Sequence, residues 1–533
     1  MKTNADIIKF IEMVISEHKD YWDKLLPEMK RYRDSYESKF WTDRNIDKSM
    51  IQIETADCYS YIEGFISSLF TKNPAVVIAR DVANPNGNAK LAQETCNRWL
   101  FEQRTQLEIA SRLALIYPNS CLKISPRESE DMLDKVAIRA IPPWEIIVDQ
   151  DASSWNTQRF CGHTYYLPLN EANDKYGYKK WIPTPKRDYF ETERLKHTVQ
   201  SELPNEYLYI QIIELYDFVN DKLYIWTPNL KDGLLQKDTI PLRTYDEQPL
   251  APISPLYYSR KPEKPLCGIS AVSRVYDQFY EKNILRTYWA NAIRRDSRQY
   301  IYKEGAFDPE ELAKITAGID GAMIACDEPN IGGLIMPIGV EPISGNFDRY
   351  LGQIESDINR GTILAPFSRG ETTGVTATEI SALAQYSSSQ LGKLARERDI
   401  AIEQLATIYL RTVSLMAEEG ERTIIEVDEE PKVITVADLD AKFKIIALDQ
   451  ASTPISSEIA KQNLMNLLPV LTQLGIDQEK IKEEVIRLFN LPKTFLEPAP
   501  APEAPPQAAP AQPQAAGPTP EQLQMMAMTG GLG

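Results

Sequence analysis

Apolar residues recur at helical spacing in the first part of the chain. A helix is predicted over residues 4–38 because its apolar positions share one face: Ile7, Ile8, Ile11, Val14 and Ile15. Two further helices are predicted over 49–70 and 88–117. Each ends shortly before a proline, which disfavours helical backbone in the residue that precedes it. The N-terminal region is therefore expected to be helical.

Short apolar runs bounded by turn residues predict strands after these helices. The first are expected over 136–141, 145–148, 207–218 and 222–226, the last two forming a hairpin around Asn220-Asp221. Strands are expected again over 423–427, 432–436 and 443–447. A proline-dense connection over 240–266 separates the two groups. The pattern as a whole predicts an α+β fold that is mainly helical.

Residues 269–300 lack proline and glycine and predict one long helix. This segment holds six basic residues and three acidic ones inside a chain that is acidic overall. Its apolar residues do not keep to one face. A helix that is apolar on more than one side is packed on more than one side. We therefore expect this helix to contact neighbours on several sides.

A compact insertion rich in glycine and proline, 301–345, separates this helix from the next, 346–364. The loop that follows leads into a long helix ending near residue 417. At the start of that helix, Thr376 and Glu379 have the spacing of a capping box, in which each side chain bonds the other's backbone amide. Val375 and Ile380 occupy the positions of a hydrophobic staple.

The C-terminal part is expected to hold two helices, over 455–474 and 477–490. From residue 498 onward the chain is largely proline, alanine and glutamine, a composition that cannot bury enough apolar surface to fold. We expect 498–533 to be a disordered tail.

Charge and composition limit the possible functions. The chain has 533 residues, with 59 Lys and Arg against 76 Asp and Glu, giving a net charge of −17. Tight, sequence-independent binding of nucleic acid depends on basic residues and counterion release, so this acidity argues against it. It does not argue against a protein through which nucleic acid passes.

The sequence predicts no metal or cofactor site. The three histidines are widely separated, and the six cysteines include no CxxC pair, so we interpret them as reduced thiols. The first 22 residues interleave apolar and charged residues, which indicates an amphipathic helix and not a signal peptide. No apolar window is long enough to cross a membrane.

Motifs for catalysis are equally scarce. The chain has no GxxxxGK[ST], GxGxxG, HExxH or GxSxG. Asp149 and Asp151 follow a predicted strand and resemble a DxD metal motif, although acidic residues also favour such turns. Arg294, Arg295 and Arg298 could contact phosphate or lie on a solvated or intersubunit face. Arg369 could contact DNA or be an ordinary loop arginine.

The order of these elements resembles the portal proteins of tailed bacteriophages, most closely the head–tail connectors of short-tailed phages. Three segments carry the resemblance: Ile141–Asp149, Cys267–Ser270 and Gly370–Ile380. The first belongs to the N-terminal domain, the second opens the first long helix, and the third spans the capped loop. The similarity extends over most of residues 1–490, and its specific part is the order and spacing of the segments.

The resemblance implies a ring of subunits, typically twelve, with the four parts called wing, stem, clip and crown. The implied assignments are 1–268 and 376–448 for the wing, 269–300 and 346–365 for the stem, 301–345 for the clip, and 449–497 for the crown. Residues 366–375 would form the tunnel loop at the channel constriction, with these candidate DNA-facing residues: Phe367, Ser368, Arg369, Glu371, Thr372 and Thr373.

The resemblance also implies a function and partners. The ring would sit in the virion at one capsid vertex, after assembly in the cytoplasm of a bacterial host. Double-stranded DNA would pass through it during packaging and ejection. Terminase and then the tail adaptor would dock on the clip, and the major capsid and scaffolding proteins would surround the ring. ATP hydrolysis belongs to the terminase in this family, so the subunit itself is expected to have no enzyme activity.

Two alternatives stay open at this point. One is a metal-dependent enzyme that uses the carboxylates of Asp149 and Asp151. The other is a large helical scaffold unrelated to viruses.

Overall fold

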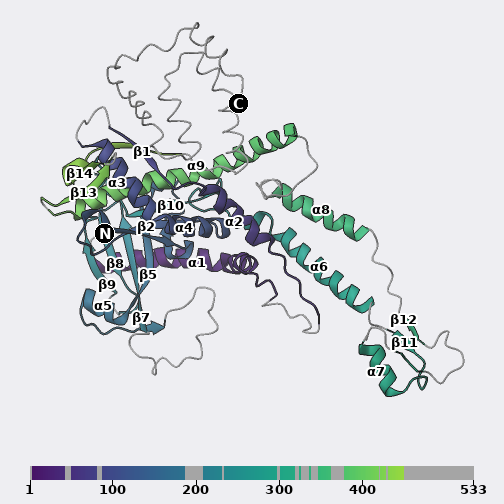
Figure 1. The fold of residues 1–533 in the computed structure, drawn as a ribbon. Helices are drawn as coiled ribbons and strands as arrows, with labels where there is room; N and C mark the ends of the chain where they lie inside the picture. Colours follow the sequence, from purple (N-terminus) through teal and green to yellow (C-terminus); the bar gives the residue numbers. More distant parts are fainter. Residues whose placement is uncertain are drawn as a thin grey trace, which may run out of the picture. The chain divides into compact units, whose positions relative to one another are not determined.

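The computed structural model describes most of the chain up to residue 448. The described residues are 3–41, 50–80, 87–185, 208–230, 233–296, 300–317, 323–325, 335–337, 346–361, 377–418, 420–427 and 430–448. They form a mixed helical and sheet structure (Figure 1), as the α+β prediction requires.

The helices account for much of this part of the chain. Their bounds are α1 Asn4–Tyr36, α2 Asp57–Leu69, α3 Ala89–Glu102, α4 Arg104–Ile116, α5 Leu169–Tyr176, α6 Tyr276–Asp296, α7 Pro309–Ala317, α8 Asn346–Gly361, α9 Ala377–Met416 and α10 Val436–Leu439. The two longest, α1 and α9, confirm the predictions for 4–38 and for the helix ending near 417.

The strands form several antiparallel sheets. Their bounds are β1 Val76–Arg80, β2 Ser120–Pro126, β3 Val136–Ile141, β4 Ile146–Val148, β5 Phe160–Pro168, β6 Thr184–Pro185, β7 Leu208–Asp217, β8 Lys222–Trp226, β9 Leu234–Asp238, β10 Ile253–Leu256, β11 Tyr300–Tyr302, β12 Ile335–Pro337, β13 Arg422–Val427, β14 Glu430–Thr435 and β15 Phe443–Ala447.

The largest sheet has the order β4-β5-β7-β8-β9, with β6 paired to β7. A three-stranded sheet has the order β10-β2-β3. The pairs β1-β15, β11-β12 and β13-β14 complete the described sheets. The hairpin predicted around Asn220-Asp221 is confirmed as β7 and β8, and Asp221 adopts a positive φ of 50° in its turn.

The main hydrophobic core lies among α2, α3, α4, α9 and the sheet that contains β2. Its centre includes Trp99 of α3 stacked on Tyr409 of α9, with ring centroids 4.0 Å apart. Helix α1 divides its apolar face between two clusters. Ile7, Ile11 and Val14 pack on the large sheet, and the C-terminal half of α1 enters the main core. Pro27 lies inside α1 and does not end it.

Three predicted helix boundaries are wrong. The helix predicted over 49–70 begins at Asp57, because residues 51–55 have no regular secondary structure. The helix predicted over 88–117 is two helices that meet at Gln103, whose ψ of 6° breaks the first one. Helix α6 begins at Tyr276 and not at residue 269, and Tyr300 already belongs to β11.

The described part of the 301–345 insertion is a small α/β unit, as predicted. Its two short strands, β11 and β12, are paired, and α7 lies between them in sequence. Helix α8 follows and ends at Gly361, within the 346–365 segment assigned to the stem. The tunnel loop 366–375, the predicted crown 449–497 and the tail 498–533 lie outside the described residues.

Candidate functional site

Most residues predicted to line a channel fall outside the described part of the chain. These are Arg298 of the stem and the tunnel-loop residues Phe367, Ser368, Arg369, Glu371, Thr372 and Thr373. Val375 and Thr376, which were predicted to cap the next helix, also lie outside it. Helix α9 begins one residue after Thr376, and Glu379 and Ile380 lie in its first turn. The capping box therefore stays a prediction. Of the stem arginines, Arg294 is exposed near the C-terminal end of α6, and Arg295 follows it in the same helix.

The motif Cys267–Ser270 forms a joint between the end of α4 and the start of α6. Gly268 lies so close to the Pro118 carbonyl that a Cβ at this position would be 1.6 Å from its oxygen. Ser270 is buried, and its hydroxyl donates to the Ile116 carbonyl at 2.6 Å. Carbonyls at the end of a helix have no partner within the helix. The motif thus satisfies the end of α4 and fixes where α6 starts.

One side of α6 holds the extended segment 51–55 by a ladder of side chains. Asn283, Thr287 and Asn291 accept from the backbone N–H groups of Thr55, Ile53 and Ile51, at 2.9, 3.0 and 2.9 Å. All three side chains are buried. Four residues of helix rise about 6.0 Å and two residues of strand about 6.6 Å, so the two repeats match.

The opposite side of α6 packs on α8. Trp289 contacts Phe347 with ring centroids 5.3 Å apart. The buried Lys282 ammonium lies 3.0 Å from Asp57 of α2 and 3.3 Å from Glu355 of α8. At about 100° per residue, the ladder and these contacts lie roughly 180° apart on the helix. This arrangement confirms the expectation that α6 packs on more than one side.

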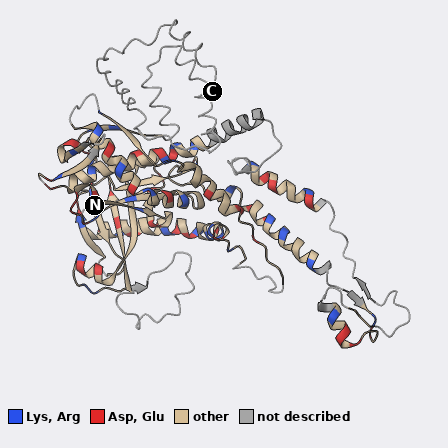
Figure 2. Cartoon of the chain, in the orientation of Figure 1, with Lys and Arg blue, Asp and Glu red and all other residues tan. Residues whose placement is uncertain are grey.

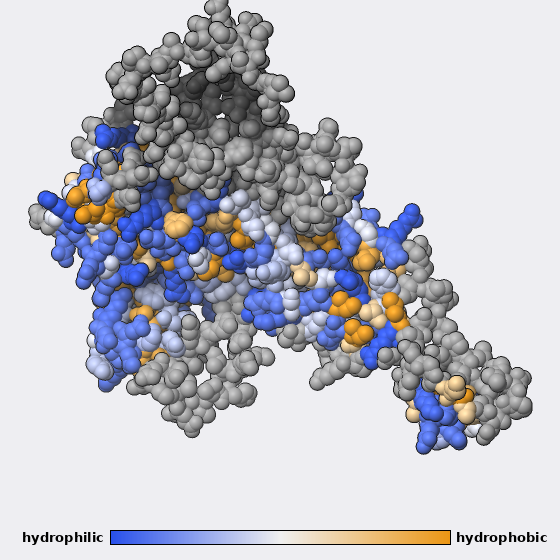
Figure 3. All heavy atoms as spheres, in the orientation of Figure 1, coloured by the Kyte–Doolittle hydropathy of each residue, from blue (hydrophilic) through white to orange (hydrophobic). Residues whose placement is uncertain are grey.

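Two apolar residues of α6 remain exposed. Tyr288 is 56% exposed between the two packed sides, and Ile293, one turn beyond Trp289, is 52% exposed on the side that packs on α8. Hydrophobic residues gather over α6 and α8 in the space-filling view (Figure 3). Helix α8 carries charges of both signs, whereas every charged residue of α6 from Lys282 to Arg294 is basic (Figure 2). The exposed apolar residues of α6 therefore lie among basic side chains.

Asp149 and Asp151 are both held by one arginine. The Arg159 guanidinium bonds the Asp149 carboxylate at 2.6 and 2.7 Å and Asp151 at 3.1 Å. These hydrogen bonds keep the pKa of Asp149 below its usual value. Within the described residues, no group of three or more acidic, histidine or cysteine side chains is arranged to hold a metal ion. The arrangement is that of a strand-end turn closed by an ion pair.

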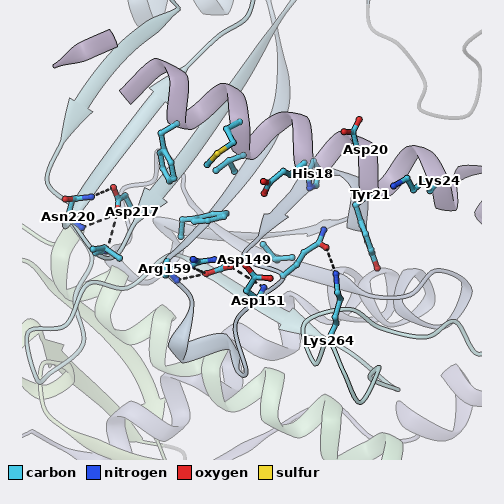
Figure 4. A pocket seen from close by; sticks show the side chains of 18 residues that line it. His18, Asp20, Tyr21, Lys24, Asp149, Asp151, Arg159, Asp217, Asn220 and Lys264 are labelled. Atoms are coloured by element: carbon cyan, nitrogen blue, oxygen red, sulfur yellow. Dashed lines mark hydrogen bonds and ion pairs between the residues drawn. The ribbon is translucent and has the colours of Figure 1, made fainter. Parts of the chain in front are cut away.

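The Asp149 turn borders a groove of about 740 Å³ beside α1 (Figure 4). Helix α1 forms one wall, and the turns after β4 and β7 form the other. The lining combines apolar side chains with five acidic and three basic ones. The sequence did not indicate this groove, because its walls lie more than 100 residues apart in the chain.

A buried cluster of charged residues connects β2 of the three-stranded sheet to β5 and β7 of the largest sheet. Lys123 of β2 donates to Glu214 of β7 at 2.5 Å and contacts His163 Nδ1 of β5 at 3.1 Å. Because an ammonium only donates, Nδ1 is the acceptor and the ring proton lies on Nε2, which is 3.6 Å from Glu145. The Tyr165 hydroxyl donates to the other Glu214 oxygen at 2.7 Å.

The cluster fixes the ionisation of its members. Burial, together with the charges of Lys123 and Arg139, lowers the pKa of His163 well below its usual value. Burial alone would raise the pKa of Glu214, but the Lys123 charge and its hydrogen bonds keep that pKa below its usual value. His163 is therefore neutral and Glu214 ionised at neutral pH. Sequence reasoning missed this cluster, since its members lie on three different strands.

Acidification below pH 6.5 is expected to destabilise the fold through His18. Burial lowers the pKa of His18 to about 4, opposed by its bond to the Trp144 carbonyl and by Asp23. The unfolded chain then binds a proton that the folded chain does not, so stability falls as the pH drops from 6.5 toward 4. We expect a loss of about 1–3 kcal/mol over this range.

Urea unfolding at several pH values measures this effect in the full chain and in His18→Asn, which retains a side-chain donor. The variant should lose part of the pH dependence. An identical slope in both proteins would assign the acid sensitivity to other groups, His163 first among them.

The comparisons with known proteins give little further guidance. No helix in the described ranges is both long and apolar enough to cross a membrane. No protein-family model matches the chain, and no curated protein matches it. Among solved structures, a chain from the virion of a native gene transfer agent particle resembles it with a TM-score of 0.41 and 11% identity. That similarity covers 82% of this chain and 90% of the other.

Proposed function

We propose that this chain is a portal-type subunit whose copies assemble into a ring around a channel for double-stranded DNA. The ring, of twelve copies by the family resemblance, would stand at one vertex of a virion. It would be docked first by terminase and later by a tail adaptor, with major capsid and scaffolding proteins around it. The subunit itself carries out no catalysis in this proposal.

The surroundings of α6 are the observation that supports this proposal most. The helix has two opposite sides covered within the chain and two apolar residues, Tyr288 and Ile293, left exposed. In a ring, each copy has a neighbour on either side, so these exposed residues would face the neighbouring copies. Helices α6 and α8 also bracket a small α/β unit, in the order that the resemblance implies for stem and clip.

The acidic composition is compatible with a conduit. A channel that bound DNA tightly would trap it, whereas an acidic wall repels phosphate and sparse basic groups offset the repulsion. The metal-enzyme alternative is less favoured, because Arg159 already neutralises the Asp149 carboxylate. The metal-enzyme alternative predicts that Mg²⁺ or Mn²⁺ raises the melting temperature of the protein and that Asp149→Asn removes this effect.

Electron microscopy and sedimentation of the purified full chain test the ring. We expect closed rings for the natural sequence and smaller species for a Tyr288→Glu, Ile293→Glu variant, since charges would then face an apolar contact. Ile424→Glu is the matched control, because Ile424 is also more than half exposed but lies on β13. Absence of rings under all conditions would contradict the proposal and leave the non-viral scaffold as the better hypothesis.

The tunnel loop is expected to act after the ring has formed. Arg369→Ala, or deletion of residues 368–373, should leave ring assembly unchanged and reduce the amount of DNA packaged or retained. The comparison requires rings by microscopy and packaged DNA by nuclease protection. If the variants fail to form rings, the loop has a structural role instead.

A further inference from the structure

An exposed, well-anchored loop follows α5. Tyr178 and Ile182 are 92% and 66% exposed, and Lys179 and Lys180 between them are exposed as well. The loop is nevertheless held in place. The indole N–H of Trp181 donates to Asn173 Oδ1 at 2.8 Å, and the Ile182 N–H donates to the Asn229 carbonyl at 2.9 Å. The loop therefore presents apolar and basic side chains from a fixed backbone.

The groove beside α1 has the complementary chemistry. Met13 of α1 and Val219 of the β7–β8 turn are 52% and 71% exposed at its walls. Glu17 and Asp20 are exposed on α1 along the same groove. The α1 wall carries Glu17 and Asp20 with Lys24, and the other wall carries Asp149, Asp151 and Asp217 with Arg159 and Lys264, so the groove as a whole is acidic (Figure 4).

The loop and the groove lie at opposite ends of the same strand. Thr184, just after the loop, pairs with Tyr209 near the start of β7. Asp217 at the end of β7 lines the groove. Eight residues of strand span about 26 Å, so a loop cannot reach the groove of its own chain across this distance. Two different surfaces at opposite ends of one subunit suit a head-to-tail contact, which generates a ring when its rotation closes.

We propose that the Tyr178–Ile182 loop of one copy docks into the α1 groove of the next copy. Tyr178 and Ile182 would cover the apolar walls at Met13 and Val219, and Lys179 and Lys180 would face Glu17 and Asp20. The partner is thus a second copy of this chain. This inference rests on the proposed ring and adds a second contact to the one at Tyr288 and Ile293 of α6.

Disulfide trapping tests the contact directly. The five described cysteines are buried, so a Cys326→Ser background leaves few reactive thiols. Tyr178→Cys and Met13→Cys are made singly and together. Under mild oxidation, mixing the two single variants should give a disulfide-linked dimer. The double variant should give a series of species beyond the dimer.

The number of subunits in the cross-linked species distinguishes a head-to-tail contact from a two-fold contact. A two-fold contact between double variants would stop at a dimer. A disulfide within one chain is excluded by distance, since bridged residues have Cα atoms less than about 7 Å apart. Rings with no cross-linked product would overturn the docking and leave the proposed function standing. No ring from the unmodified chain would overturn both.

Charge reversal gives an independent measurement. Lys179→Glu with Lys180→Glu should raise the protein concentration needed for half-maximal assembly by at least about tenfold, because like charges would then meet. Adding Glu17→Lys and Asp20→Lys should restore assembly. Lys237→Glu, an exposed position on β9, is the control and should change little. Equal effects of the control and the loop variant would also overturn the docking.

Discussion

Replacement of Lys123 by methionine is expected to lower the free energy of unfolding by about 3–5 kcal/mol. The substitution removes the partner of the Glu214 carboxylate at 2.5 Å and leaves that charge buried. Breaking a buried ion pair from one side costs this much, because the remaining ion has lost both water and partner. The contact joins β2 to β7, so the loss should affect both sheets together.

Chemical denaturation of Lys123→Met and of Lys123→Met with Glu214→Met measures the effect. The double variant should return to within about 1–2 kcal/mol of the natural sequence, since well-packed apolar residues often replace a buried pair at little cost. The single variant should also approach the natural protein as the pH falls. Its unpaired Glu214 has a raised pKa, and protonation removes the buried charge. A double variant as unstable as the single one would contradict the role of charge.

The triple variant Asn283→Leu, Thr287→Val, Asn291→Leu is expected to release segment 51–55 from α6. Each substitution removes one acceptor for a backbone N–H, and each such bond contributes about 1 kcal/mol. Amide exchange at residues 51, 53 and 55 should therefore become about 100-fold faster, while α9 and the large sheet remain protected. Hydrogen-exchange mass spectrometry of a peptide covering 50–56 provides the measurement.

The control for this variant is Arg286→Gln, an exposed position on the same helix. It should leave exchange over 50–56 unchanged. Unchanged exchange in the triple variant would show that Trp41 and Phe40, which also bond residues 53 and 54, hold the segment on their own.

Side chains of α3 bond the backbone of a neighbouring strand in the same way as side chains of α6 bond segment 51–55. This arrangement explains why the start of α2 was predicted wrongly. Asn97 and Gln93 of α3 accept from the N–H groups of Val76 and Ile78 on the outer edge of β1. In sequence, polar residues four apart on a helix are typical of a solvated face. Nothing local distinguishes them from a ladder that holds an extended segment, so residues 51–55 were assigned to the following helix.

The strands were predicted well where apolar runs end at turn residues, as in β3 and in the β7–β8 hairpin. β2 and β5 were not predicted. Each pairs on one edge with a strand close in sequence, β2 with β3 and β5 with β4, and on the other edge with a distant strand, β10 or β7. Pairing with the distant partner leaves no periodic signal within either segment.

The sequence by itself determined the order of the elements and showed that α6 is apolar on more than one side. Periodicity, proline placement and the absence of a single apolar face are local properties of the sequence. It also marked Cys267–Ser270 as a distinctive motif, but placed it at the opening of the long helix, whereas α6 begins at Tyr276. Only the tertiary structure decided what covers α6, which charges are buried with Lys123, and where the α1 groove lies. Those features depend on residues more than 30 positions apart, brought together by packing that no local pattern encodes.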